Sequence, residues 1–349
     1  MDTAALSGQL QRFCEANRIS GVIRVTHKDQ ILHSQSFGYA CRETQTPFAP
    51  DSMFSLYSLS KPFCAIGLLL LADQGLVDID AHPGKYVPEA KGFDSRVTIR
   101  QLLQHTSGLP DFASSPGYMA AYAPGYPSKA REHLQILSGF PNFFAPGTAD
   151  RYSNIGYIIS ALIIENVSGL SYEAYMRKAV FDPLGAKTAV VDNETLQIPN
   201  RVQGYVLRDG QVCPTEKDHN WMLGAGDVVG TADDVYALNR AVKHRLLLKP
   251  ETWDLVLTPS PLNKKGLGCA VTKWHGKPRI QHNGGASGFR TLHIHLPEED
   301  FDIIFLSNSG YGDSAPTVRS EVSEIVYRAF FDASAASEKP LEMDTGYVS

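Results

Sequence analysis

The pattern of hydrophobic and polar residues differs between the two ends of the chain and its middle. An apolar stripe with helical spacing predicts a helix over residues 3–17, and strand-like runs at 21–27 and 31–39 flank a polar turn, which is typical of a hairpin. Strand patterns return near the C-terminus, at 267–274, 278–282, 289–296 and 301–306, before a helix at about 316–331. We expect the strands from both ends to pair in one antiparallel sheet, covered by the first and last helices.

Helical patterns dominate the middle of the chain. One helix runs through a continuous apolar block to Leu71, and Pro62 indicates its start, because proline is tolerated only in the first turn of a helix. This helix should therefore begin near Ser58 to Ser60 and end by Gly75. Further helices are predicted at 97–105, 129–137, 154–169, 171–180 and 231–242, and a loop region rich in glycine and proline lies between 110 and 146.

These patterns predict a single domain of the α/β class, of the α+β type. Residues 1–55 together with 265–333 would form a sheet subdomain, residues 56–264 an all-helical subdomain, and residues 334–349 a loose polar tail. The sequence contains no evident internal repeat, low-complexity tract or linker.

Composition and charge exclude several classes of protein. The 349 residues are 43% hydrophobic and 20% charged, as in ordinary globular proteins, and the net charge of -5 argues against a nucleic-acid partner. The longest apolar run, near residues 65–72, is too short to span a membrane. No signal peptide is visible, so we expect a cytoplasmic protein, or an extracytoplasmic one if a signal was removed. Five scattered cysteines without a C-x-x-C pair predict free buried thiols, rather than a disulfide framework or a zinc site.

The start of the helix in the middle of the chain carries the first candidate chemistry. Ser58 and Lys61 are three residues apart, so both side chains lie on one helix face. A lysine on a helix this apolar is costly to bury unless it is paired or neutral. An isolated S-x-x-K pattern arises often by chance, and its position at the start of a buried helix strengthens it.

Two further stretches could contribute to a site. Tyr152 and Asn154 stand at a loop-to-helix junction, from which both could point into a cleft; alternatively, Tyr152 is a packed aromatic and Asn154 an N-cap. Residues 281–289, which include His282, Asn283, Gly284 and Gly285, lie between two predicted strands. Glycines there would let a ligand approach a strand edge, although a tight turn is the simpler explanation.

Taken together and in this order, the three motifs resemble those of the serine beta-lactamase and penicillin-binding protein superfamily. The Tyr-x-Asn and His-x-Gly variants are similar to the branch of class C beta-lactamases, D-alanyl-D-alanine carboxypeptidases, D-amino-acid peptidases and amidases, and family VIII esterases. The stretches 102–110, 181–185, 224–231 and 306–308 also resemble recurrent segments of that branch. The resemblance implies a beta-lactamase/transpeptidase-like fold, with a sheet made by both termini and a helical subdomain.

The resemblance also implies a role for each residue. Ser58 would be the nucleophile that forms an acyl-enzyme, with Lys61 or Tyr152, treated as one coupled unit, as its base. Asn154 would donate a hydrogen bond to Lys61 or to the substrate. The backbone N–H groups of Ser58 and Gly285 would form an oxyanion hole, and the glycines would leave room for the acyl group. No cofactor or metal is implied.

Two departures from the family pattern bear on the substrate. His282 stands where many lactamases have a lysine that binds the substrate carboxylate, and Asn283 replaces a hydroxyl residue. Both changes favour an esterase, D-peptidase or amidase that acts on a small ester, amide or peptide. The alternatives are a beta-lactamase or acyltransferase of the same fold, or a slowly deacylating beta-lactam sensor.

Other polar and aromatic residues are weaker candidates. His293 and His295 alternate on a strand and share one face; no third ligand of suitable spacing is evident, so we interpret them as strand-face residues rather than a metal pair. His105 is expected to shape its turn, and Trp221 could line a substrate cleft or pack in the core.

Overall fold

The structure is a computed structural model that describes residues 3–112, 114–115, 118, 130–193, 196–216, 222–310 and 315–332. Its main feature is a six-stranded sheet in the order β2-β1-β11-β10-β9-β8, in which every neighbouring pair is antiparallel. The strands are β1 (Gly21–His27), β2 (Gln30–Phe37), β8 (Ala270–Trp274), β9 (Lys277–Ala286), β10 (Phe289–Leu296) and β11 (Phe301–Ser307). The predicted pairing of strands from both ends of the chain is confirmed.

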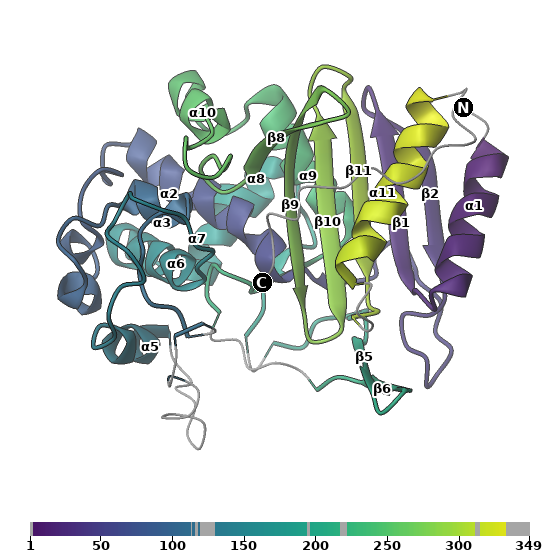
Figure 1. Cartoon of the computed structure of the whole chain (residues 1–349), viewed down its shortest axis with the longest axis horizontal. Coiled ribbons are helices and arrows are strands. Elements are labelled where there is room, and N and C mark those ends of the chain that lie inside the picture. Colours follow the sequence, from purple (N-terminus) through teal and green to yellow (C-terminus); the bar gives the residue numbers. More distant parts are fainter. Residues whose placement is uncertain are drawn as a thin grey trace.

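Helices cover both faces of this sheet (Figure 1). Helices α1 (Thr3–Ala16) and α11 (Ala315–Phe331) pack on one face, where their apolar side chains meet those of the strands in one cluster. Helix α9 (Ala232–His244) lies on the other face, and Thr231 caps it in a capping box with Asp234. The terminal helices therefore cover the sheet as the sequence predicts.

Most helices of the middle segment gather beside the end of the sheet that β9 and β8 form (Figure 1). At their centre, α2 packs against α6, and most residues of both helices are buried. The helices here are α2 (Lys61–Asp73), α3 (Ile99–Leu103), α5 (Ala130–Leu137), α6 (Ile155–Ser168), α7 (Tyr172–Met176), α8 (Asp182–Leu184) and α10 (Pro250–Leu257). Shorter turns are η1 (Tyr57–Ser60), η2 (Pro83–Lys85), η3 (Pro88–Gly92) and the π-helical η4 (Arg177–Phe181).

The middle segment is not purely helical, which corrects the sequence-based expectation. Strands β3 (Phe54–Ser55), β7 (Val228–Gly230) and β4 (Val190–Val191) form a small sheet, and β5 (Tyr205–Arg208) pairs with β6 (Gln211–Pro214). Strands of two to four residues are too short to show an alternating pattern. Helix α10 was also missed, although Pro250 at its first position is a start signal.

Strand β9 is longer than predicted. It continues to Ala286, so His282 to Gly285 lie within the strand and not between two strands. The two glycines mask the strand pattern in the sequence, because glycine has a low strand propensity. β8 pairs with β9 only as far as Gln281. Among the described strands, residues 282–286 therefore have a neighbour on one side only, β10.

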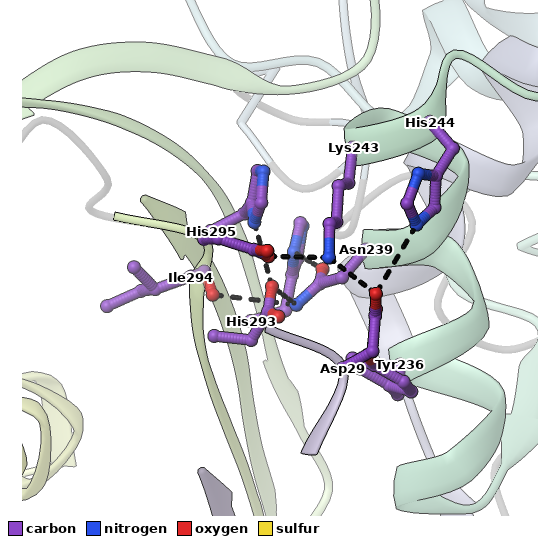
Figure 2. Close-up of polar contacts among 10 residues, drawn as sticks. Asp29, Tyr236, Asn239, Lys243, His244, His293, Ile294 and His295 are labelled. Carbon is purple, nitrogen blue, oxygen red and sulfur yellow. Dashed lines mark hydrogen bonds and ion pairs between the residues drawn. The ribbon is translucent and has the colours of Figure 1, made fainter. Parts of the chain in front are cut away.

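A buried polar network joins α9 to the sheet (Figure 2). His293 Nδ1 lies 2.6 Å from Asn239 Oδ1, and Asp302 Oδ1 lies 2.9 Å from both Asn239 Nδ2 and His295 Nδ1. We call these four residues the α9 network. His293 and His295 do share one strand face, as predicted, and that face is turned toward α9. Among the described residues, no group of three or more His, Cys, Asp or Glu side chains could hold a metal ion.

The five cysteines agree in part with the prediction of free buried thiols. All five cysteines are free, and Cys41 and Cys213 are only partly buried.

In the part of the chain that the structure describes, no single helix is long and apolar enough to cross a membrane. One bent helix pair, Ile155–Ser168 with Tyr172–Leu184, meets the length and composition criteria.

Candidate active site

Ser58 is presented by a sharp turn between β3 and α2. Leu56 N donates to Val228 O at 2.9 Å, which ties the turn to the small sheet. Tyr57 then adopts a left-handed conformation with φ of 49°, which is uncommon for a residue with a side chain and marks a constrained turn. Ser58 is half-buried, whereas Leu59 and Ser60 are buried. The turn η1 passes directly into α2 at Lys61, so the predicted helix start is confirmed.

Lys61 is fully buried beside Ser58 and contacts only neutral acceptors. Its Nζ donates to Ser58 Oγ at 3.1 Å, to Asn154 Oδ1 at 2.8 Å and to Ala225 O at 2.6 Å. Burial lowers the pKa of Lys61 from 10.5 to about 7, against the opposing influence of Asp111 and other acidic groups. An amine with this pKa is deprotonated in about half of the molecules at neutral pH, so Lys61 can accept a proton there.

Asn154 is held in place by a residue that the sequence analysis missed. The buried Asp111 Oδ2 accepts hydrogen bonds from Asn154 N at 2.6 Å, Ile155 N at 3.0 Å and Ser153 Oγ at 3.2 Å. Asp111 thus caps the N-terminus of α6, and the Asn154 side chain makes no capping bond. Asn154 Oδ1 instead accepts from Lys61, so the expected direction of that hydrogen bond was wrong.

Tyr152 lies against Lys61 and His105. The Lys61 Nζ is 4.9 Å from the centroid of the Tyr152 ring, and the His105 ring stacks on that ring with centroids 4.5 Å apart. His105 also shapes its turn, as predicted: its φ is 60°, its Nδ1 accepts from Ser153 N at 3.1 Å, and its carbonyl accepts from Arg151 N at 3.0 Å. His105 therefore positions the loop that carries Tyr152.

His282 is a neutral imidazole next to the lysine. Its Nδ1 lies 2.7 Å from its neighbour's backbone oxygen, Asn283 O. Because a carbonyl can only accept, Nδ1 carries the proton and Nε2 has the lone pair. Burial lowers the pKa of His282 well below 6.5, and the nearby charge of Lys61 lowers it further. His282 thus supplies no positive charge at neutral pH.

Gly284 of β9 has a packing role that the sequence analysis did not foresee. A Cβ at Gly284 would lie 2.1 Å from Leu56 O, so only glycine lets the strand approach the Ser58 turn. Thr291 Oγ1 reinforces this contact by donating to Leu56 O at 2.9 Å. A Cβ at Gly285 would meet the Arg290 side chain at 3.1 Å. The contact with Leu56 O therefore accounts for Gly284, and clearance for an acyl group at Gly285 stays a prediction.

The residues that the sequence analysis missed come from three separate loops. Asp111 directly follows the 102–110 stretch, and Lys265 directly precedes a glycine-rich stretch; neither position carries a recognisable signal. Ala225 contributes only its carbonyl, which a sequence pattern cannot reveal. Its turn is held by Asp227, whose Oδ2 accepts from Gly224 N at 2.7 Å, and burial raises the pKa of Asp227 to about 7. Trp221 lies outside the described residues.

The assembled geometry suits acyl transfer to a serine. A half-buried hydroxyl lies next to an amine that can lose its proton at neutral pH, and a phenol ring packs against that amine. Beside them, β9 offers a strand edge without a partner among the described strands.

Comparison with known proteins agrees with this geometry. The sequence profile of the Beta-lactamase family matches residues 6–326. Penicillin-binding protein 4* of Bacillus subtilis (strain 168) is 30% identical over 318 residues, which are 84% of this chain and 69% of that protein. A D-aminopeptidase of Gluconobacter oxydans (strain 621H) is 24% identical over 343 residues, which are 93% of this chain and 63% of that protein.

Solved structures share the fold. A penicillin-binding protein homologue from Pyrococcus abyssi superposes with a TM-score of 0.80 at 22% identity, covering 95% of this chain and 77% of that one. A D-stereospecific amidohydrolase from Streptomyces sp. gives 0.79 at 21%, covering 95% and 99%. EstCE1, a hydrolase with promiscuous acyltransferase activity, gives 0.78 at 21%, covering 93% and 99%. This chain belongs to the beta-lactamase family and is a serine hydrolase of the beta-lactamase and penicillin-binding protein type.

Proposed function

We propose that the protein hydrolyses small esters or amides, with amides of D-amino acids as the favoured class, through an acyl-enzyme on Ser58. The observation that carries this proposal is the 3.1 Å contact between Ser58 Oγ and Lys61 Nζ, a buried amine with a pKa of about 7. Serine is a poor nucleophile unless a base takes its proton, and such an amine is a competent base at neutral pH.

In this mechanism Lys61 and Tyr152 act as one acid–base unit. The Ser58 proton passes to Lys61 while the Ser58 oxygen bonds to the substrate carbonyl. When the bond to the leaving group breaks, Tyr152 gives its hydroxyl proton to the leaving nitrogen or oxygen, and Lys61 returns a proton to Tyr152. Asn154 Oδ1 and Ala225 O hold the amine in place throughout. Water then attacks the acyl-enzyme by the reverse route.

The substrate would lie along the edge of β9 beyond Gln281, which has no partner among the described strands. Backbone N–H groups of Ser58 and Gly285 would stabilise the oxyanion, and the edge would pair with an extended acyl group. The neutral His282 offers no charge for a carboxylate, so an ester or amide without one fits better than a beta-lactam. Similarity to a D-aminopeptidase, and a fold shared with a D-stereospecific amidohydrolase, support the D-amino-acid class.

The test is turnover of D-phenylalanine amide, its L-enantiomer, p-nitrophenyl butyrate and nitrocefin, followed by intact mass after a fluorophosphonate probe. We expect steady turnover of the ester and the D-amide, and a single probe adduct that Ser58→Ala abolishes. The matched control is Ser36→Ala, which removes an exposed hydroxyl on β2. Stoichiometric release without turnover would contradict hydrolysis and favour a sensor. Undiminished labelling of Ser58→Ala would rule out Ser58 as the nucleophile.

A further inference from the structure

A second lysine lies against Tyr152. Lys265 sits in the turn before β8, and its Nζ is 5.8 Å from the centroid of the Tyr152 ring, compared with 4.9 Å for Lys61. Its side chain is only 6% exposed. A buried ammonium group is costly, so its position beside one of the acid–base residues requires an explanation.

The fold holds this lysine firmly. Lys265 N donates to Asn263 Oδ1 at 3.1 Å, and Asn263 Nδ2 donates to Gln104 O at 2.7 Å. Gln104 precedes His105, whose ring stacks on Tyr152. The Asn263 side chain therefore links the Lys265 turn to the turn that supports Tyr152. In addition, Ser260 N donates to Lys265 O at 2.8 Å.

The charged and titratable groups near Lys265 come from several elements. Asp150 Oδ2 is 3.9 Å from Lys265 Nζ, on a side chain that is 42% exposed and therefore partly screened by water. His105 and His282 are neutral, because burial lowers the pKa of each well below 6.5. Burial also lowers the pKa of Lys265, and Asp150 opposes that shift. In this low-dielectric setting, a nearby positive charge acts strongly on any negative charge that forms on Tyr152.

We propose that Lys265 is a positioning residue for proton transfer, whose ammonium group stabilises the negative charge on the Tyr152 oxygen while the leaving group takes the Tyr152 proton. The proposal rests on the proposed function above. Tyr152 loses its O–H proton to the leaving atom and regains a proton from Lys61, so Lys265 itself exchanges none. Because its ammonium group lies against the Tyr152 ring and its side chain is almost entirely buried, Lys265 acts on Tyr152 rather than on a substrate carboxylate.

The test compares two leaving groups on one acyl group. An amide nitrogen must be protonated as it leaves, whereas p-nitrophenolate departs without a proton. Lys265→Met should therefore lower the single-turnover rate of Ser58 acylation by D-phenylalanine amide roughly ten- to hundredfold, and the rate of acylation by the D-phenylalanine p-nitrophenyl ester by less than about threefold. The dissociation constant of the noncovalent complex should stay unchanged for both substrates. Lys265→Arg, which keeps the charge, should recover much of the loss.

The control is Lys264→Met, which removes the exposed neighbouring lysine and should leave both substrates unaffected. Equal losses on amide and ester would overturn the proposal, as would a change in KM confined to a carboxylate-bearing ester. If Lys265→Met lowers the melting temperature sharply, Lys265→Gln and Lys265→Arg are compared instead. The ratio of the amide rate to the ester rate should then fall in Lys265→Gln and stay close to the wild-type ratio in Lys265→Arg. If the wild type turns over neither substrate, the proposed function fails first, and this inference falls with it.

Discussion

Two polar clusters in this protein, the site around Lys61 and the α9 network, differ in the charge of their hydrogen-bond acceptors. In the α9 network, Asp302 provides a carboxylate acceptor for Asn239 and His295, and Asn239 Oδ1 accepts from His293 (Figure 2). At the site, the three acceptors around Lys61 are a hydroxyl, an amide and a carbonyl. Lys61 itself is as deeply buried as the four residues of the α9 network, so burial alone does not distinguish it from them.

The difference is the charge of the partner. A buried amine that meets only neutral acceptors loses affinity for its proton, and the pKa of Lys61 falls to about 7. Lys243, beside the α9 network, instead contacts Asp29 at 2.7 Å and Asp300 at 2.6 Å, and its hydrogen bonds to them raise its pKa. Neutral partners prepare a group for proton transfer, whereas charged partners fix it as a structural link.

The largest expected effect is the loss of acylation in Lys61→Met. Removing the base should slow acylation of Ser58 by about 10²–10⁴-fold, the usual contribution of general base catalysis. Folding should be retained, because methionine fills a similar volume without a buried charge. Stopped-flow release of p-nitrophenol measures the rate. Lys243→Met is the control and should acylate normally; a rate for Lys61→Met within threefold of wild type would exclude Lys61 as the base.

Asp302→Ala should show the opposite pattern to Lys61→Met: stability is lost and the acylation rate is retained. It leaves the buried donors of Asn239 and His295 without their acceptor, which should lower the free energy of unfolding by about 3 kcal/mol. The acylation rate of the folded protein should remain that of the wild type. Urea denaturation measures the loss, and Asp300→Ala, at a more exposed ion pair, should cost less than about 1 kcal/mol. A slower acylation rate in folded Asp302→Ala would show that the two clusters are coupled.

The pH dependence of kcat/KM should reflect Lys61. Below pH about 7 the rate should fall tenfold per unit, because Lys61 must lose its proton to act as a base. The free energy of unfolding should also depend on the protonation of Lys61. Between pH about 7 and 10.5 the unfolded chain binds this proton and the folded chain does not, so the free energy of unfolding should rise with pH relative to Lys61→Met. A rate that is flat from pH 5 to 8 would contradict this assignment.

The smallest expected effect is a shift in the pH profile of kcat/KM in Asp111→Asn. The negative charge of Asp111 raises the pKa of Lys61, so its removal should lower the midpoint of the acid limb by about one pH unit or less. Asparagine can still accept hydrogen bonds from the N-terminus of α6, so most of the structure around Asn154 should persist. A midpoint that moves upward would mean that Asp111 does not act on Lys61 through its charge.

Much of the fold and the core of the site could be predicted from the sequence. Pro62 marked the start of α2, and the three-residue spacing placed Ser58 and Lys61 on one face, because both features depend on local helix geometry. The terminal strands were recognised from their strand-like runs, and their pairing in one antiparallel sheet was the simplest arrangement. The short strands β3, β4 and β7 were missed because two or three residues carry no periodicity.

The sequence by itself placed Ser58 and Lys61 on one helix face, and the resemblance of its three motifs to a known family implied that Tyr152 and Asn154 join them. Only the tertiary structure decided their protonation and their hydrogen-bond partners. It brought in Asp111 and Lys265 and directed the Lys61 proton toward Asn154 Oδ1. It also explained Gly284 by its contact with Leu56 O. The reason is physical: a pKa or a close approach depends on burial and on partners far apart in the chain, and local patterns do not record either.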